Sequence, residues 1–290
     1  MRSMTGYGQA LLVRDGREMT AEVKTVNHRF LDVAVRMPRH LGFLEDRVRK
    51  QTGAAFRRGH ADVFITYRNT RTDARRVICD PVLAKAYGEA LHQLAEATGA
   101  DAQVPLSLYA QLPDVLAVME NEEDQEAVSA LLSDVLEEAL KKADDMRLRE
   151  GEALRRDLTL HLNALEEIRG RIALRAPGVV RDYSERLQQR IAEFGVAEPD
   201  EQRVIQEVAI FADRAAIDEE LSRLSSHVSQ AFALMESGGE CGSKLNFLAQ
   251  EMNREVNTIG SKALDGEIAA LVVSAKAEIE KLREQIQNVE

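Results

Sequence analysis

Polar and apolar residues alternate along two segments near the start of the chain, residues 3 to 14 and residues 18 to 36. Alternation with a period of two is typical of a strand that buries one face. Between the segments, Asp15-Gly16 is a dipeptide that favours a tight turn between antiparallel strands. The pattern therefore predicts a β-hairpin with residues 18 to 36 as its second strand.

Two polar residues of that second strand have an unusual position. Asn27 and Arg29 share the parity of apolar side chains such as Val23 and Val33, unless a bulge changes the register. A buried amide or guanidinium is unfavourable without a partner. Arg29 is therefore a candidate phosphate contact, and a structural ion pair explains its position equally well.

Shorter elements of both kinds follow the hairpin. Residues 42 to 57 have a helical pattern, and residues 60 to 69 have the pattern of a strand. A short strand at residues 77 to 79 precedes a helix that begins at Pro81 and reaches about Ala97, because proline is favoured in the first turn of a helix. The first region is therefore predicted to mix α and β elements.

Long helices rich in Glu, Leu, Arg and Ala are predicted from about Glu122, with breaks near residues 176 to 178 and 198 to 200, which contain proline. The final helix has apolar residues spaced alternately four and three apart, a seam that requires a helical partner in the same chain or in another subunit. These residues are Ile268, Val272, Ala275, Ile279, Leu282, Ile286 and Val289.

The predicted fold class is α+β, with a mixed N-terminal α/β domain followed by a long, mostly helical C-terminal region. The expected parts are a basic N-terminal domain at residues 1 to 120, a helical connector at 121 to 205 and a helical C-terminal domain at 206 to 290. A chain of 290 residues that is 44% hydrophobic can bury a sizeable core. No apolar run approaches a membrane span, so we expect a soluble, cytoplasmic protein.

Charge and cysteine content limit the kinds of partner and metal site that the chain can have. Residues 1 to 80 carry 16 Lys and Arg against 9 Asp and Glu, a surplus of +7, although the whole chain has a net charge of −11. This asymmetry fits a phosphate-bearing partner held by the basic part, and a basic subdomain with solvated arginines fits it as well. Cys79 and Cys241 form no closely spaced pair, which argues against a cysteine-based zinc site.

Candidate chemistry lies on a predicted helix near the end of the chain, beside its apolar face. Glu251, Glu255 and Lys262 fall on one line of this helix, with Arg254 next to them. Two carboxylates one turn apart repel by roughly 0.2 to 0.5 kcal/mol, so they imply a nearby cation. A divalent metal ion is one candidate. Arg254 is the other, and spacing alone favours this ion pair.

A second polar edge is predicted on an earlier helix. Glu220, Arg223 and His227 lie three and four residues apart beside an apolar stripe. A histidine next to carboxylates can bind a metal or transfer protons near pH 7, whereas a single helical histidine is more often a surface residue. Three aromatic residues next to basic ones are candidates for base stacking, although such residues are more often core. They are Phe30, Phe56 and Tyr67.

Several segments resemble the YicC/YloC family of bacterial proteins, in the family's order and over the whole chain. They are MRSMTGYG, EVKTVNHRFLDVAVRMP, EELSRLSSH, GSKLNFLAQEMNRE, NTIGSK and IEKLREQIQNVE. The resemblance implies an endoribonuclease that needs a divalent cation. It also implies a mixed N-terminal domain, a helical C-terminal domain and a hexameric assembly around RNA.

The family's elements fall on Val26 to Arg29, Glu219 to His227 and Gln250 to Lys262. Two positions depart from its usual pattern, because Ala216 and Asn246 stand where the family usually has aspartate. If either aspartate binds metal, this chain has a weaker metal affinity or a different preferred ion.

We therefore predict an endoribonuclease that uses Mg²⁺ or Mn²⁺, hydrolyses phosphodiester bonds in single-stranded or loop RNA and forms a homohexamer. The candidate metal ligands are Glu219, Glu220, His227, Glu251 and Glu255. The candidate catalytic residues are His227, Glu251, Arg254, Glu255 and Lys262. The candidate RNA contacts are Asn27, Arg29, Asn253 and Asn257. One alternative is a non-catalytic adaptor that presents RNA to other nucleases, and another is a purely structural helical assembly.

Overall fold

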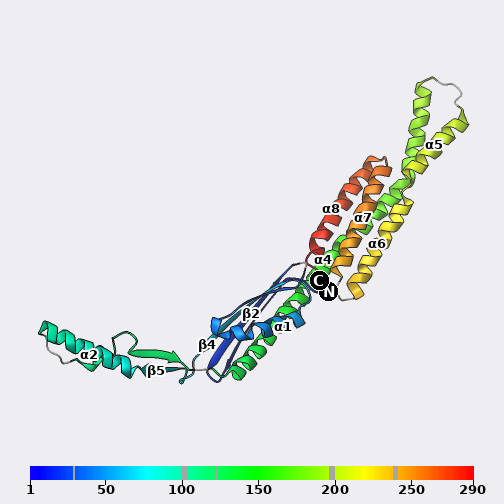
Figure 1. The fold of residues 1–290 in the computed structure, drawn as a ribbon. Helices are drawn as coiled ribbons and strands as arrows, with labels where there is room; N and C mark the ends of the chain where they lie inside the picture. The colour runs from blue at the N-terminus through cyan, green and yellow to red at the C-terminus, as the bar shows by residue number, and fades with distance from the viewer. Residues whose placement is uncertain (29, 100–103, 122, 196–199, 238–240) are drawn as a thin grey trace.

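The computed structural model describes residues 1–28, 30–99, 104–121, 123–195, 200–237 and 241–290. It confirms the α+β class, because a β-sheet region precedes a long helical region. The molecule is elongated, with a small arm at one end, the sheet next to it, and then a helical bundle that continues into a helical projection (Figure 1).

The main sheet has four strands in the order β1-β2-β4-β3. β1 (Gly6–Arg14) and β2 (Arg17–Val26) form the predicted hairpin. Asp15 and Gly16 connect them with φ angles of 50° and 71°, as a turn with two left-handed residues requires. β4 (His60–Asn69), also predicted, pairs antiparallel with β2.

The second strand of the hairpin is shorter than predicted. β2 ends at Val26, and β3 (Asp32–Arg36) crosses to the far edge of β4, where it pairs in parallel. The prediction that Asn27 lies on the buried side of the strand was wrong, because the strand ends before Asn27 and a loop follows. This loop also allows β3 to form hydrogen bonds with the free edge of β4. Asn27 is exposed, and its side-chain amide donates to the Gln287 main-chain oxygen at 2.7 Å. Arg29 lies outside the described residues.

One face of the sheet is covered by helices. α1 (Glu45–Ala55), which follows the short 3₁₀ helix η1 (Arg39–Leu44), and the first part of α4 (Gln125–Glu193) bury it. α4 comes very close to β1, because a Cβ atom at Gly8 would lie 2.1 Å from the main-chain oxygen of Ala139. The absence of a side chain at Gly8 therefore allows α4 to pack this closely against β1.

The arm consists of α2 (Pro81–Thr98), the short helix α3 (Leu106–Tyr109) and a two-stranded antiparallel sheet. The strands of this small sheet are β5 (Arg75–Cys79) and β6 (Leu116–Glu120). α2 confirms the predicted helix, because the Asp80 side chain accepts hydrogen bonds from the main-chain nitrogens of Val82 and Leu83. It ends at Gly99, which has a φ of 69°.

The predicted break near residues 176 to 178 was wrong, because α4 continues through Pro177. Proline removes a helical hydrogen bond, so other contacts must hold the two sides of the helix together. Ile172 and Val179 are both buried in the helical core. The Arg175 guanidinium also lies 2.6 Å from Asp182 Oδ2 and 2.8 Å from Asp265 Oδ2. Tertiary packing therefore outweighs the local preference.

α4 belongs to two cores and makes up most of the expected connector. Its first part packs on the sheet, and its middle packs on α6 (Asp218–Ser237), α7 (Gly242–Lys262) and α8 (Gly266–Ile286). Its last part forms the projection with α5 (Glu201–Ala215) (Figure 1). The predicted apolar seam of the final helix is buried in this bundle, so its partners are in the same chain.

The two ends of the described chain meet between the sheet and the bundle (Figure 1). Ser3 and Val289 form an isolated antiparallel bridge, and the Met4 main-chain nitrogen donates to the Asn288 oxygen at 2.9 Å. Cys79 is exposed, Cys241 is buried, and both are free thiols. Within the described parts of the chain, no helix is both long and apolar enough to cross a membrane.

Candidate active site

Most of the predicted site residues lie on two adjacent helices, α6 and α7. The helices pack through apolar stripes that include Leu224 and Val228 on α6 and Met252 and Val256 on α7, all of which are buried. Polar residues one helical step away from these stripes lie at the edge of the contact. The site is therefore a consequence of the amphipathic pattern of both helices.

Glu220 and Lys262 join the start of α6 to the end of α7. Lys262 Nζ lies 2.6 Å from Glu220 Oε1, and Glu220 is 6% exposed. Burial acts to raise the pKa of the Glu220 carboxyl, but the hydrogen bond from Lys262 and a main-chain hydrogen bond outweigh it, so the pKa is lowered. Glu220 is thus ionised at neutral pH and holds the ammonium group in place.

Arginines approach the other candidate carboxylates. Arg223 Nη1 lies 4.0 Å from Oε1 of the buried Glu255, and the same guanidinium pairs with Glu219. Arg254 Nη1 lies 3.9 Å from Glu251 Oε2. The cations next to Glu251 and Glu255 in this structure are therefore arginines. Spacing alone indicated Arg254, whereas the approach of Arg223 to Glu255 joins α6 to α7 and was not predicted.

These carboxylates do not form a metal site within one chain. No group of three His, Cys, Asp or Glu residues among those described is arranged to hold a metal ion. Glu220 and Glu255 are instead engaged by Lys262 and Arg223. Within one chain, the described residues therefore do not gather these side chains into a site for a divalent cation.

Two buried polar atoms at the α6–α7 contact have no hydrogen-bond partner among the described residues. They are Oε2 of Glu220 and Nδ1 of His227. His227 lies seven residues after Glu220, or about two turns along the same face of α6. Since nearly all buried polar atoms are hydrogen-bonded, a group bound here would find a carboxylate acceptor and an imidazole nitrogen.

Two family models together match most of the chain. The family model described as "Endoribonuclease YicC-like, N-terminal region" matches residues 1–156, and "Endoribonuclease YicC-like, C-terminal" matches residues 172–290. The chain belongs to the YicC-like family. The C-terminal match contains the whole of α6, α7 and α8, and the boundary between the two matches falls within α4.

Two relatives match this YicC-like chain over nearly its full length. A protein from Clostridioides difficile named "Probable endoribonuclease YicC" is 38% identical over 291 residues, which cover 99% of each chain. A protein of the same name from Haemophilus influenzae is 31% identical over 288 residues, again 99% of each chain. The similarity is therefore not confined to one domain.

The candidate RNA contacts of the YicC-like chain lie in two separate places. Asn253 is half-buried and Asn257 is exposed on α7. Asn27 contacts Gln287, just after the end of α8. The start of α7 packs against Val289, so the 21 residues of α7 separate this end of the bundle from Lys262 by about 30 Å. Asn27 and Lys262 therefore do not converge within one chain.

The aromatic residues considered for stacking have different environments. Phe56 is core at 1% exposed, and the Tyr67 hydroxyl donates to Glu123 Oε1 at 2.6 Å, whereas Phe30 is 65% exposed. Two other aromatics, Tyr7 and Phe64, project from the outer face of the sheet. Strand alternation could have indicated them, because each has the opposite parity to the buried residues of its strand.

Proposed function

We propose that this YicC-like protein is a cytoplasmic endoribonuclease that hydrolyses phosphodiester bonds in single-stranded or loop RNA at the α6–α7 contact. The descriptions of both family models and the names of both relatives support this activity. The structural observation that carries it is His227 Nδ1, which has no hydrogen-bond partner among the described residues and lies about two turns along α6 from the Glu220–Lys262 pair.

Different side chains stabilise negative charge and transfer protons during phosphodiester cleavage. Lys262 and Arg254 hold the phosphate and stabilise the extra negative charge of its transition state. The His227 imidazole transfers protons between the reacting oxygens. Glu220 stays ionised because its pKa is lowered, so it positions Lys262 and does not donate a proton. Glu251 and Glu255 orient the neighbouring arginines.

In this reaction an oxygen nucleophile bonds to phosphorus as the bond from phosphorus to the leaving ribose oxygen breaks. A base takes the nucleophile's proton, and the leaving oxygen receives a proton. The nucleophile is water or the ribose 2′-hydroxyl, which leave different ends on the product. Mapping the ends of a cleaved RNA distinguishes them, because only the 2′-hydroxyl leaves a 2′,3′-cyclic phosphate.

Cleavage of an end-labelled RNA by purified protein tests the proposal. We expect His227→Ala and Glu251→Gln to bind this RNA with little change and to cut it more slowly, by roughly tenfold or more. Glu236→Gln is the matched control, because Glu236 is exposed near the end of α6. If the purified wild-type protein binds RNA but never cuts it, the adaptor alternative is correct.

A requirement for Mg²⁺ or Mn²⁺ stays a prediction. Cleavage should be compared in EDTA and in a titration of each ion. Cleavage that persists in EDTA would remove this part of the proposal and leave the proton-transfer roles of the side chains intact.

We also propose that the protein forms a homohexamer, with the arm as one contact between copies. A two-stranded sheet is marginally stable alone. In this one, the side chains of Val77 and Val118 are 66% and 67% exposed. An apolar groove of about 550 Å³ lies beside it, lined by residues that include Leu106, Tyr109 and Leu116. Apolar surface of this extent on so small a unit supports burial against another copy.

Light scattering tests the assembly. We expect the wild-type protein to have six times the chain mass of 32.3 kDa. Val77→Asp combined with Val118→Asp should lower that mass, whereas Val273→Asp, at a position 68% exposed on α8, should not. A wild-type protein that is monomeric at all concentrations would rule out the hexamer.

A further inference from the structure

Four side chains form a row across the main sheet, one on each strand. Tyr7 on β1 is directly opposite Lys24 on β2, and Phe64 on β4 is directly opposite Arg36 on β3. Lys24 is opposite Asp62, two residues before Phe64, so Lys24 and Phe64 are diagonal neighbours. Because the strand order is β1-β2-β4-β3, aromatic and cationic residues alternate along the row.

The members of this row contact one another. Lys24 Nζ lies 5.8 Å from the centre of the Tyr7 ring and 5.7 Å from the centre of the Phe64 ring. Arg36 Cζ lies 5.0 Å from the centre of the Phe64 ring. These are cation–π distances, so the four side chains form one connected aromatic and cationic strip.

The strip lies on the open face of the sheet. α1 and α4 bury the other face, where Val23 and Val63 are fully buried. Tyr7 is 39% exposed, Lys24 and Arg36 are also exposed, and Phe64 is half-buried. In the described part of the chain, the helices that pack on this sheet therefore leave the strip accessible to a partner.

The chemistry of the strip suits bases better than phosphates alone. Lys24 Nζ lies 2.8 Å from Glu22 Oε1, so part of the positive charge is already neutralised. Among the described residues no carboxylate pairs with Arg36, whose planar guanidinium can stack on a base or bind a phosphate. Exposed aromatic rings stack on any base, because every base has a π-face.

The length of the strip matches a short single-stranded segment. Neighbouring strands are about 4.8 Å apart, so four strands span about 14 Å. Aromatic residues on a four-stranded sheet can stack about two or three unpaired bases. A duplex does not offer its base faces in this way.

We propose that Tyr7, Lys24, Phe64 and Arg36 bind single-stranded RNA by stacking on its bases, at a surface distinct from the α6–α7 contact. This inference rests on the proposed function, which makes RNA the substrate, and it names where unpaired substrate is held. It also provides a reason for the preference for single-stranded or loop RNA, since paired bases cannot stack on the strip.

A short single-stranded RNA that contains the fluorescent base 2-aminopurine tests the inference, because stacking quenches this base. The full-length protein should quench it and bind it. Tyr7→Ser and Phe64→Ser should each weaken binding roughly 5- to 100-fold and reduce the quenching. Arg36→Ala should weaken binding as well. Duplex RNA of the same sequence should show much smaller effects.

Leu11→Ser and Val13→Ser are matched controls, because both residues are exposed on the same face of β1 but lie outside the strip. Thermal melting of every variant identifies loss of folding, and binding is compared only among variants that melt as the wild-type protein does. The controls should bind RNA as tightly as the wild-type protein.

The outcomes separate this inference from the proposed function. Strip variants that fold, bind and quench like the wild-type protein overturn the inference, even if the wild-type protein cuts RNA. A wild-type protein that never cuts RNA overturns the proposed activity, while loss of binding in the strip variants still supports the strip as the RNA surface. Strip variants that lose self-association and keep RNA binding show a contact between copies, which also overturns the inference.

Discussion

Arg147, in the first third of α4, donates a hydrogen bond from Nη2 to Glu290 Oε2 at 2.7 Å. Its Nε donates to the Ser3 main-chain oxygen, also at 2.7 Å, and its guanidinium lies 4.8 Å from the centre of the Phe56 ring. The Arg147 side chain is only 1% exposed. One buried guanidinium therefore joins both ends of the described chain to the helix that links the sheet core and the helical core.

Replacing this guanidinium should destabilise the protein strongly. Arg147→Met leaves Glu290, whose side chain is 12% exposed, without its partner. We expect the free energy of unfolding to fall by about 3 to 5 kcal/mol, measured by urea denaturation. In the control Arg2→Met, the lost pair with Asp144 is partly exposed, and the expected change is at most about 1 kcal/mol. Equal losses in the two variants would contradict the role of Arg147.

The close approach of α4 to β1 should make Gly8 intolerant of a side chain. The Cβ atom of Gly8→Ala would lie 2.1 Å from the Ala139 oxygen and 2.5 Å from the Ala143 nitrogen, and neither main-chain atom can move without shifting the helix. We expect a loss of about 1 to 3 kcal/mol in unfolding free energy. Gly42→Ala is the control, because nothing lies within 4 Å of its Cβ position. Thermal melting of both variants tests the difference.

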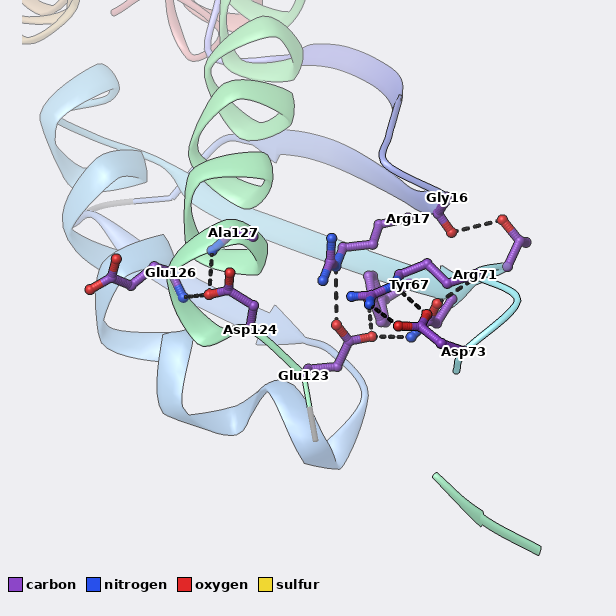
Figure 2. A network of polar contacts seen from close by, with 11 residues as sticks. Gly16, Arg17, Tyr67, Arg71, Asp73, Glu123, Asp124, Glu126 and Ala127 are labelled. Atoms are coloured by element: carbon purple, nitrogen blue, oxygen red, sulfur yellow. Dashed lines mark hydrogen bonds and ion pairs between the residues drawn. The ribbon is translucent and has the colours of Figure 1, made fainter. Parts of the chain in front are cut away.

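A partly buried carboxylate fixes the base of the arm. Glu123 Oε2 accepts from Arg17 Nε at 3.0 Å, and Oε1 accepts from the Tyr67 hydroxyl at 2.6 Å (Figure 2). Asn69 donates to the same carboxylate. Burial and the contact with Glu123 raise the pKa of Tyr67 above its ordinary value, so the phenol remains a donor. Both segments that lead into the arm are attached to the sheet at this point.

Glu123→Gln should loosen the arm without unfolding the sheet. The substitution leaves the buried Arg17 without a countercharge, so residues 70–74 should exchange amide hydrogens faster, and so should residue 121. Glu126→Gln is the matched control, because Glu126 is exposed and points away from this cluster in Figure 2. Unchanged exchange in Glu123→Gln would mean that other contacts hold the arm.

Acid should weaken the protein partly through Glu220. Burial acts to raise its pKa, but the hydrogen bond from Lys262 and a main-chain hydrogen bond dominate and lower it. A carboxyl with a lowered folded-state pKa contributes stability above its unfolded pKa of about 4.3. That contribution is lost as pH falls through the folded-state pKa. Urea midpoints between pH 2 and 6 should therefore change less in Glu220→Gln than in the wild-type protein or in Glu236→Gln.

The elements that could be predicted from the sequence are those with local causes. Asp15-Gly16 favours the hairpin turn by its own backbone preferences, and Asp80 caps the helix that Pro81 opens. The four-and-three spacing from Ile268 onward correctly predicted a buried seam. The helix break predicted at Pro177 was wrong, because buried side chains and the ion pairs of Arg175 outweigh the local preference of proline against helix.

The candidate site likewise contains some contacts that local spacing predicted and others that depend on tertiary packing. Helical spacing alone indicated Arg254 as the cation next to Glu251, because residues three apart are neighbours on any helix. The pairing of Glu220 with Lys262 joins residues 42 positions apart and depends on how α6 packs on α7. The position of Asn27 could not be predicted, because the loop after β2 changes the parity of the chain.

Sequence by itself determined which residues of each strand or helix share a face, since backbone geometry sets periods of two and about 3.6 residues. Only the tertiary structure decided which faces meet. Tyr7, Lys24, Phe64 and Arg36 each point outward by strand parity, but they form one row because β4 lies between β2 and β3. That order depends on burying the inner face of the sheet against α1 and α4, which is a long-range interaction that no local pattern encodes.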